Sequence, residues 1–496
     1  MKKVTIVWNI KEDDYRRFKN VLLFVTLAGI MFLSILRCFD NTMYGDEAFS
    51  ILLAKASFKD TIAMTAADVH PPFYYIFLKI LIRLFGSNGF VWHLSGIIPF
   101  LALVFLAAFA FRKEFGFLVS YIFILFVSVM PSSFYLNVMI RMYSFSILFV
   151  TICFYEGYLI CKNDKLKNWL LFILSGLGAA YTHYYAFAVV CLIYFIDFVI
   201  LIKRDKRKIG KCVLCTVISL LGYSPWLVIF IKSLLRTSNS FWVEEIPSVK
   251  ESIEYLFGRG VLGWVCFILF LLSAIAFFLK EKGVVHLKNG EGEEKIVVLG
   301  WRQGQFSAEA VLILSAIFII VIFFLFLEIF SYAVRPVYLV RYLYPAAGIV
   351  WLAAALAVTR ADKRKVLALC FLILMLVNFV PKSLEQYKKD AVTDRKCNET
   401  VAYVRDTIDD NTILVSDIGM LYSRFFTLYF EGTRLSALHH LQMDSVEDNQ
   451  RVYLFLEKEM TEELEDIIYE NGLKIVERKE GVYVGKYPAE LYILSR

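Results

Sequence analysis

The segment "FYYIFLKILIRLF", residues 73–85, decides how this chain is arranged. It is apolar, yet it is shorter than the roughly 20 residues that a membrane-spanning helix needs. Tyr75, Lys79 and Arg83 recur every four residues, so on a helix they form one polar stripe. A short helix with one polar face is typical of a segment that lies in the membrane interface. We therefore expect residues 73–85 to form an interfacial helix that does not cross.

The composition of the whole chain indicates a membrane protein. Of its 496 residues, 59% are hydrophobic, and the mean hydropathy is +0.61. Repeated apolar runs of this kind exclude an ordinary soluble protein. The net charge of +7 comes from short Lys/Arg clusters between the runs, so it carries topology information and does not indicate a nucleic-acid partner. The nine cysteines are scattered and predict structural thiols.

Twelve apolar runs are candidates for membrane helices. They are residues 21–36, 73–85, 90–111, 115–131, 142–161, 168–181, 186–202, 211–231, 262–279, 309–330, 343–359 and 366–380. Six basic clusters flank them, and all six can lie on the cytoplasmic side only if residues 73–85 do not cross. We therefore predict about eleven spans, a cytoplasmic N-terminus over residues 1–20 and a first external loop over residues 37–89.

The character of the chain changes at Lys382. "TILVSD", "RVYLFL" and "LKIVERKEGVYVGKYPAELYILSR" look like strands, and "CNETVAYVRDTIDD" and "TEELEDIIYENG" look like amphipathic helices. Residues 382–496 are therefore expected to form a small α/β domain on the extracytoplasmic side. Residues 21–381 would form the multi-pass α-helical transmembrane domain that precedes it.

Polar residues gather on the outer side of this predicted topology, whereas the inner side carries mainly Lys/Arg clusters. The outer set consists of Asp46 and Glu47 in "GDEA", Asp68 and His70 in "DVHPP", Arg141 and Tyr143 in "IRMY", His183 in "YTHYY", and Arg341 and Tyr342 in "VRYLYP". Taken singly, each has an ordinary structural explanation, such as solvated charge or anchoring at the lipid headgroups. Their coincidence on one side favours a functional site.

The residue types of this set are suited to group transfer from a lipid-phosphate donor. A carboxylate can act as general base toward an attacking hydroxyl. Arginines can bind a phosphate and stabilise it as a leaving group. A groove between apolar spans can hold the lipid tail of the donor.

Two other classes of protein would explain the same residues differently. A transporter or flippase for lipid-linked sugars would place polar groups near the bilayer midplane and within internal repeats. Here the polar groups lie at one end of the predicted spans, and no repeat is visible in the sequence. A catalytically silent protein that binds envelope partners is the second alternative, and it predicts that Asp46 and Glu47 are dispensable.

"GDEA" after the first span, followed by "DVHPP" at the start of an amphipathic helix, resembles the first external loop of the protein O-mannosyltransferases. More broadly, it resembles the bacterial GT-C membrane glycosyltransferases related to them, including the aminoarabinose transferases. "IRMYSF", "YTHYYAF" and "VRYLYP" are similar to later outer-face motifs of the bacterial members. The resemblance covers residues 20–380.

The resemblance implies inverting transfer of a sugar from a polyprenyl-phosphate donor to an acceptor hydroxyl outside the cytoplasm. By that analogy Asp46 is the catalytic base, and Glu47 orients the acceptor or the loop. Asp68 and His70 would line the same pocket. The resemblance also implies that the chain has the GT-C fold.

The same analogy assigns the donor site. Arg141 and Arg341 would bind the donor phosphate, which fits their predicted side of the membrane. Tyr143, His183 and Tyr342 would contribute to donor or substrate binding beside them.

The acceptor and the cofactor stay open. The eukaryotic protein O-mannosyltransferases carry an inserted β-trefoil domain, for which residues 232–261 are far too short. This difference argues against a protein acceptor, and the acceptor hydroxyl is expected on a cell-envelope glycan, a lipid or a protein. Asp46, Glu47 and Asp68 could hold a divalent cation through oxygen ligands, but nothing in their spacing requires one.

Overall fold

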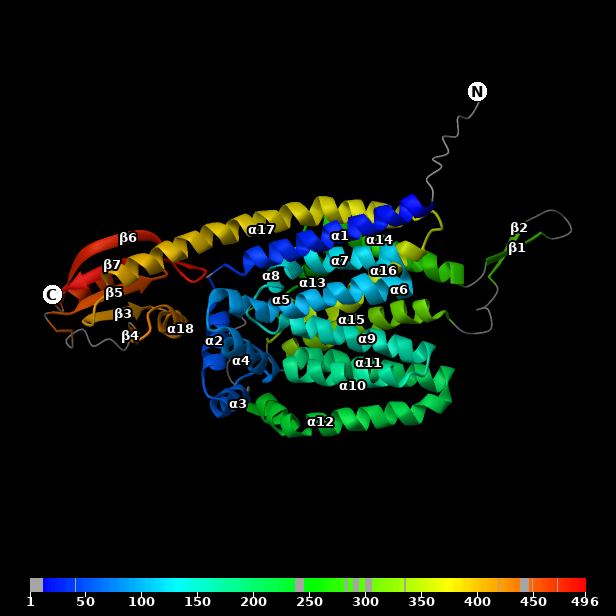
Figure 1. Cartoon of the computed structure of the whole chain (residues 1–496), viewed down its shortest axis with the longest axis horizontal. Helices are drawn as coiled ribbons and strands as arrows, with labels where there is room; N and C mark the ends of the chain where they lie inside the picture. Colours follow the sequence, from blue (N-terminus) through cyan, green and yellow to red (C-terminus); the bar gives the residue numbers. More distant parts are fainter. Residues whose placement is uncertain are drawn as a thin grey trace, which may run out of the picture.

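The computed structural model of the chain is a helical bundle with a sheet domain at one end (Figure 1). It describes residues 12–40, 42–236, 245–281, 284–288, 294–298, 306–333, 336–417, 419–437, 446–447, 449–470 and 472–496. Of the predicted cytoplasmic N-terminus, residues 1–11 lie outside this set. The rest of that segment forms the first turns of a long helix.

Every apolar run predicted from the sequence corresponds to a helix. The long helices are α1 (Glu12–Arg37), α5 (Gly89–Leu106), α7 (Phe117–Val129), α9 (Tyr143–Lys162), α10 (Leu166–Thr182), α11 (Tyr184–Arg204), α12 (Ile209–Arg236), α14 (Val261–Glu281), α15 (Ala308–Ala333), α16 (Tyr344–Arg360) and α17 (Val366–Thr407). In the described part of the chain, nine helical stretches are long and apolar enough to cross a membrane. Helices α7 and α10, with 13 and 17 residues, are the two shorter ones of the eleven predicted spans.

Shorter elements connect these helices. They are η1 (Ala107–Phe111), α6 (Arg112–Phe115), α8 (Pro131–Leu136), η2 (Lys206–Lys208), α13 (Val249–Phe257), and the hairpin of β1 (Val284–Lys288) and β2 (Glu294–Val298). The element η1 is one π-helical turn within the span that α5 begins and α6 ends. The two hairpin strands pair antiparallel.

Helix α16 lies at the centre of the bundle because its side chains are small and apolar. Residues 344–359 are all buried. Small residues let membrane helices approach closely: a Cβ added at Gly348 would lie 2.1 Å from Thr151 Oγ1 of α9. Trp351 stacks on Phe126 of α7, with ring centroids 5.5 Å apart. The other helices are thus arranged around one tightly packed central helix.

Three short helices gather at one end of the bundle (Figure 1): α2 (Gly45–Lys55), α3 (Phe58–Ala67) and α4 (Phe73–Phe85). Asp46 of α2 contacts Arg341 of the 3₁₀ turn η4 (Val340–Leu343) and Arg141 just before α9, and His70 between α3 and α4 contacts His183 just before α11. The starts of η4, α9 and α11 therefore lie at the same end. The C-terminal domain lies there too (Figure 1). The segments predicted to be external therefore converge on one end of the molecule.

Helix α4 is not among the helices long enough to cross, as predicted, but only Arg83 of its predicted polar stripe is exposed. Tyr75 and Lys79 are buried, and Lys79 Nζ donates to the carbonyl oxygen of Ala54 (2.8 Å) near the C-terminus of α2. The last carbonyls of a helix have no partner within the helix, so they attract such donors. Leu84 and Phe85 are exposed instead, with 68% and 63% of their surface accessible.

Helix α17 joins the bundle to the C-terminal domain. It is continuous over 42 residues, or about 63 Å at 1.5 Å per residue, which is twice the thickness of a bilayer core of about 30 Å. The predicted boundary at residue 382 lies inside this helix. Its far end belongs to the C-terminal domain, where Thr400 Oγ1 accepts the N–H of Tyr483 (3.0 Å).

The C-terminal domain contains a five-stranded mixed sheet in the order β4-β3-β5-β7-β6. Its elements are β3 (Thr412–Ser416), α18 (Gly419–Tyr429), β4 (Arg434–Ala437), β5 (Arg451–Leu456), α19 (Glu462–Glu470), β6 (Lys474–Val484) and β7 (Tyr487–Ser495). Strand β3 pairs in parallel with β4 and β5, and β7 pairs antiparallel with β5 and β6. The sequence analysis predicted all of these elements except α18 and β4.

Labelling with an impermeant reagent tests the predicted orientation. Ser87 beside the α4–α5 turn and Lys363 in the turn between α16 and α17 are both exposed and lie at opposite ends of the bundle. In intact cells, a membrane-impermeant maleimide should label the variant S87C above the wild-type background. It should label K363C only after permeabilisation. Labelling of K363C in intact cells would contradict the orientation.

Candidate active site

Glu47 is buried, and both of its carboxylate oxygens are used within the fold. Oε2 accepts the N–H of Tyr44 (2.8 Å), the residue that precedes α2, and Oε1 accepts the N–H of Ile140 (2.7 Å) in the loop before α9. A carboxylate at this position caps a helix N-terminus and is stabilised by the helix dipole. The geometry favours an orienting role for Glu47, because the side chain is buried and both of its oxygens bind backbone N–H groups.

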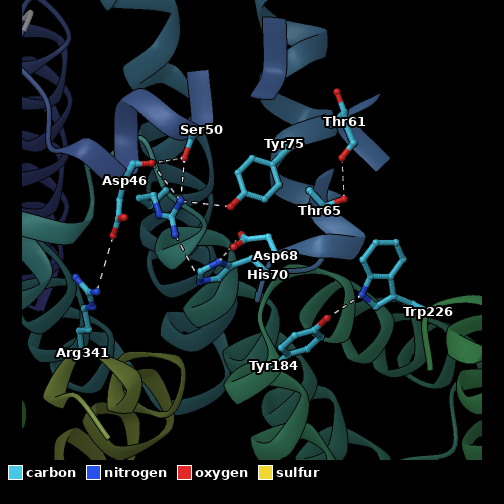
Figure 2. Close-up of polar contacts among 11 residues, drawn as sticks. Asp46, Ser50, Thr61, Thr65, Asp68, His70, Tyr75, Tyr184, Trp226 and Arg341 are labelled. Atoms are coloured by element: carbon cyan, nitrogen blue, oxygen red, sulfur yellow. Dashed lines mark hydrogen bonds and ion pairs between the residues drawn. The ribbon is translucent and has the colours of Figure 1, made fainter. Parts of the chain in front are cut away.

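Asp46, one residue earlier, points toward Arg341 (Figure 2). Successive residues of an α-helix are about 100° apart around its axis, so one of the two carboxylates faces the protein and the other faces outward. The Asp46 side chain is 45% exposed, and Oδ2 lies 3.9 Å from a guanidinium nitrogen of Arg341 on η4. An accessible carboxylate and a partly buried arginine therefore face each other.

Arg141 is buried between α2 and α4. Its Nη1 donates to the carbonyl oxygen of Asp46 (3.2 Å), to Ser50 Oγ (3.1 Å) and to Tyr75 OH (3.3 Å). Burial lowers the pKa of the guanidinium, but Tyr75 and Asp46 raise it by more, so Arg141 is charged. Among the described residues it forms no ion pair, and its Nε–H has no acceptor. A buried cation held by uncharged oxygens favours the approach of an anion.

Asp68 and His70 extend this network (Figure 2). His70 Nδ1 lies 3.1 Å from Asp68 Oδ2, and its Nε2 lies 3.4 Å from Arg141 Nη2. Because arginine can only donate, His70 Nε2 must be the acceptor. The proton of the neutral ring is therefore on Nδ1, which donates a hydrogen bond to Asp68. Burial lowers the pKa of His70, which fits this neutral tautomer. Burial raises the pKa of Asp68, but the hydrogen bond from His70 and the nearby charges bring it below its ordinary value.

His183 is the N-cap of α11 and offers a hydrogen-bond donor to the site. Its Nδ1 accepts the N–H of Tyr185 (3.2 Å), so the neutral ring carries its proton on Nε2. That nitrogen is buried and has no partner among the described residues. Burial, together with the neighbouring His70 imidazole and the positive charge of Arg141, lowers the pKa of His183 well below its ordinary value. The ring lies beside that of Tyr143, with centroids 6.1 Å apart.

An apolar cavity of about 230 Å³ opens beside the two imidazoles. His70, His183 and Tyr342 are among its lining residues, and Tyr342 stacks on Tyr185 with ring centroids 4.3 Å apart. The remaining lining is mainly apolar and comes from α11, α12 and α15: Phe187, Ala188, Phe230, Leu234, Phe326, Leu327 and Phe330. The lining suits a hydrocarbon chain whose polar end lies near the imidazoles.

All nine residues predicted for the site lie at this end of the bundle, but the three carboxylates do not form a metal site. Asp46 faces Arg341, Glu47 binds backbone N–H groups and Asp68 binds His70. Within the described ranges, no group of three or more His, Cys, Asp or Glu side chains is placed to hold a metal ion.

Two residues that hold Arg141 were not predicted for the site. Ser50 lies four residues after Asp46, so on a helix it shares that face, and this spacing is a signal that the sequence offered. Tyr75 was assigned to the polar stripe of a helix at the membrane surface. Its burial against Arg141 has no local signal, because the two residues are far apart in the chain.

Residues 69–229, less than half of the chain, match the family model described as dolichyl-phosphate-mannose-protein mannosyltransferase. No curated relative matches the chain by sequence. The crystal structure of ArnT from Cupriavidus metallidurans in the apo state matches with a TM-score of 0.61 at 12% identity, over 96% of this chain and 98% of that one.

The chain has the fold of ArnT. The structure of the same protein bound to undecaprenyl phosphate matches with a TM-score of 0.57 at 11% identity, over 95% of this chain and 97% of that chain. The predicted fold class is confirmed: a multi-pass helical membrane protein of the GT-C type with a small C-terminal sheet domain. The family match and the fold together support a membrane glycosyltransferase.

The two adjacent carboxylates should differ in their effect on stability. In E47Q, the amide has one acceptor oxygen where the carboxylate has two, and its N–H₂ group faces a backbone N–H. One buried backbone N–H is thus left without an acceptor, so the free energy of unfolding should fall by about 1–3 kcal/mol. In D46N, the exposed side chain loses only a weak ion pair, so the change should stay within about 0.5 kcal/mol. Unfolding of the purified variants in detergent measures both values. An equal loss in both variants would contradict the assignment.

His183 should make stability depend on pH. Because its pKa is lowered in the folded protein, the unfolded chain takes up a proton at higher pH than the folded one. Stability should therefore be complete above the ordinary histidine value of about 6.5 and fall as the pH drops below it. In H183N, asparagine can still cap α11, and the loss of stability between pH 7 and pH 5 should be smaller than in the wild type. Equal losses would show that His183 is not held neutral.

Proposed function

We propose that the protein is an inverting glycosyltransferase of the cell membrane. It takes a sugar from a polyprenyl-phosphate donor and transfers it to an acceptor hydroxyl on the outer face. The observation that carries the proposal is the pairing of an accessible carboxylate, Asp46, with Arg341 at 3.9 Å, while the buried guanidinium of Arg141 binds the backbone of Asp46. That set supplies a base and a phosphate-binding charge at adjacent positions.

The proposed reaction is a single displacement. The acceptor oxygen attacks the anomeric carbon of the sugar, and its proton passes to the Asp46 carboxylate. The bond between the anomeric carbon and the phosphate oxygen breaks, and the polyprenyl phosphate leaves with the electron pair. Arg341 stabilises the charge that develops on the phosphate. Attack on the face opposite the leaving group inverts the anomeric centre.

The buried groups hold these two side chains in place and add to the field that acts on the phosphate. Arg141 binds the backbone of Asp46 and adds a second positive charge within a poorly solvated region. The Nε2–H of His183 has no partner among the described residues and is available to an oxygen of the donor. His70 and Asp68 orient Arg141 from the other side.

The apolar cavity beside the imidazoles is the proposed site of the isoprenoid chain. It lies between α11, α12 and α15, with its polar end at His70 and His183. The likeness to a structure that binds undecaprenyl phosphate supports a polyprenyl-phosphate donor here. The position of the site at one end of the bundle disfavours the alternative of a flippase, for which a site near the midplane is expected.

Transfer from radiolabelled polyprenyl-phosphate sugars to membranes of the expressing cells tests the proposal. D46N should lose at least roughly 10²-fold in kcat, because the base is removed while the donor site is intact. The control D60N changes an aspartate of α3 that contacts Ser57, and it should transfer like the wild type. Wild-type transfer by D46N would contradict the assignment of the base. No transfer by the wild type with any donor would favour the flippase.

A further inference from the structure

The segment that presents Asp46 is held from outside the bundle by the C-terminal domain. This acidic segment, residues 42–47, leads from α1 into α2. The turn between β6 and β7 lies on it: the N–H of Lys486 donates to the carbonyl oxygen of Met43 (3.1 Å). A Cβ added at Gly485 would lie 2.4 Å from the same oxygen, and Gly485 has a φ of +61°. The turn thus approaches so closely that glycine is required.

Helix α18 holds the other end of the acidic segment. Arg424 Nη1 donates to the carbonyl oxygen of Gly45 (3.4 Å), directly before Asp46. The same guanidinium lies over the ring of Phe49 on α2, 4.7 Å from its centroid. One side chain of the C-terminal domain therefore contacts both the backbone beside the proposed base and the helix that carries it.

The side chain of Lys486 provides the charge in this interface. Its Nζ lies over the ring of Tyr44, 5.2 Å from the centroid, and the Tyr44 ring meets that of Tyr487 edge-on at 5.9 Å. Burial lowers the pKa of Lys486, but the carboxylates of Glu47 and Asp40 raise it by more. A cation of the C-terminal domain thus compensates the buried carboxylate that caps α2.

We infer that the C-terminal domain positions the catalytic base, and that Lys486 and Arg424 are positioning residues for Asp46. Neither residue is among those that line the cavity beside His70 and His183. They act through the backbone of residues 42–47 and through the charge balance of Glu47. The inference rests on the proposed function, because it assigns Asp46 the role of base. It gives the C-terminal domain a part in the reaction itself.

Kinetics and hydrogen exchange together test the inference. In K486M and R424L, kcat for sugar transfer should fall by roughly 10- to 100-fold, because a shift of about 1 Å in a reacting group costs about 10²-fold. The KM for the donor should stay within roughly twofold of the wild type, because removal of an interaction that only positions a reacting group acts on kcat. Amide exchange in residues 42–50 should become faster. K486R keeps a cation over Tyr44 and should restore most of the activity.

The matched control is K479M, in the same hairpin. Lys479 Nζ lies over the ring of Tyr403 on α17, 3.4 Å from its centroid, and does not contact the acidic segment. K479M should keep wild-type kcat and exchange, which would show that losing a cation–aromatic contact elsewhere in the domain does not affect the reaction.

Separate outcomes decide the inference and the proposed function. If K486M and R424L show the same kcat and the same amide exchange as the wild type, the inference is overturned. The proposed function still stands in that case, provided that the wild-type protein transfers sugar. A fall in kcat without faster exchange in residues 42–50 would also overturn it. If K486M does not fold, R424L decides. If the wild type transfers no sugar, the proposed function fails, and the exchange data alone still show whether the domain holds the segment.

Discussion

The burial of one guanidinium group is the constraint on which the rest of the site depends. Arg141 lies among uncharged oxygens of Asp46, Ser50 and Tyr75, which come from two different helices. A buried charge is costly unless each polar neighbour is in place, so the positions of α2 and α4 are tied to it. Arg141 forms no direct ion pair with a carboxylate among the described residues. The site is therefore assembled around a charge that a donor phosphate can neutralise.

Two adjacent carboxylates have different roles because a helix begins at them. Glu47 faces the protein, caps α2 and binds the loop that leads to Arg141, whereas Asp46 faces outward to Arg341. A helix N-terminus stabilises both negative charges. Glu47 is thus a structural carboxylate, and it keeps the accessible carboxylate of Asp46 in position. The C-terminal domain extends this support through Lys486.

The sequence predicted the bundle well because apolar run length is a direct consequence of bilayer thickness. It also predicted which loops meet, since the distribution of basic clusters limits the topology. It did not predict that Tyr75 and Lys79 face the protein, because their partners are distant in the chain. Lys79 binds Ala54 on α2, 25 residues away, and Tyr75 binds Arg141, 66 residues away. The capping role of Glu47 was hidden as well, because Tyr44 precedes α2 where Ser, Thr, Asp or Asn would have indicated a cap.

A structure of the protein with bound polyprenyl phosphate is the measurement that tests the account most directly. The account predicts that a phosphate oxygen lies within hydrogen-bond distance of the Arg341 guanidinium, close to the Asp46 carboxylate, and that the isoprenoid chain enters the cavity beside His183. Binding of the phosphate at the opposite end of the bundle, or in a groove away from Arg341 and Asp46, would contradict the central claim.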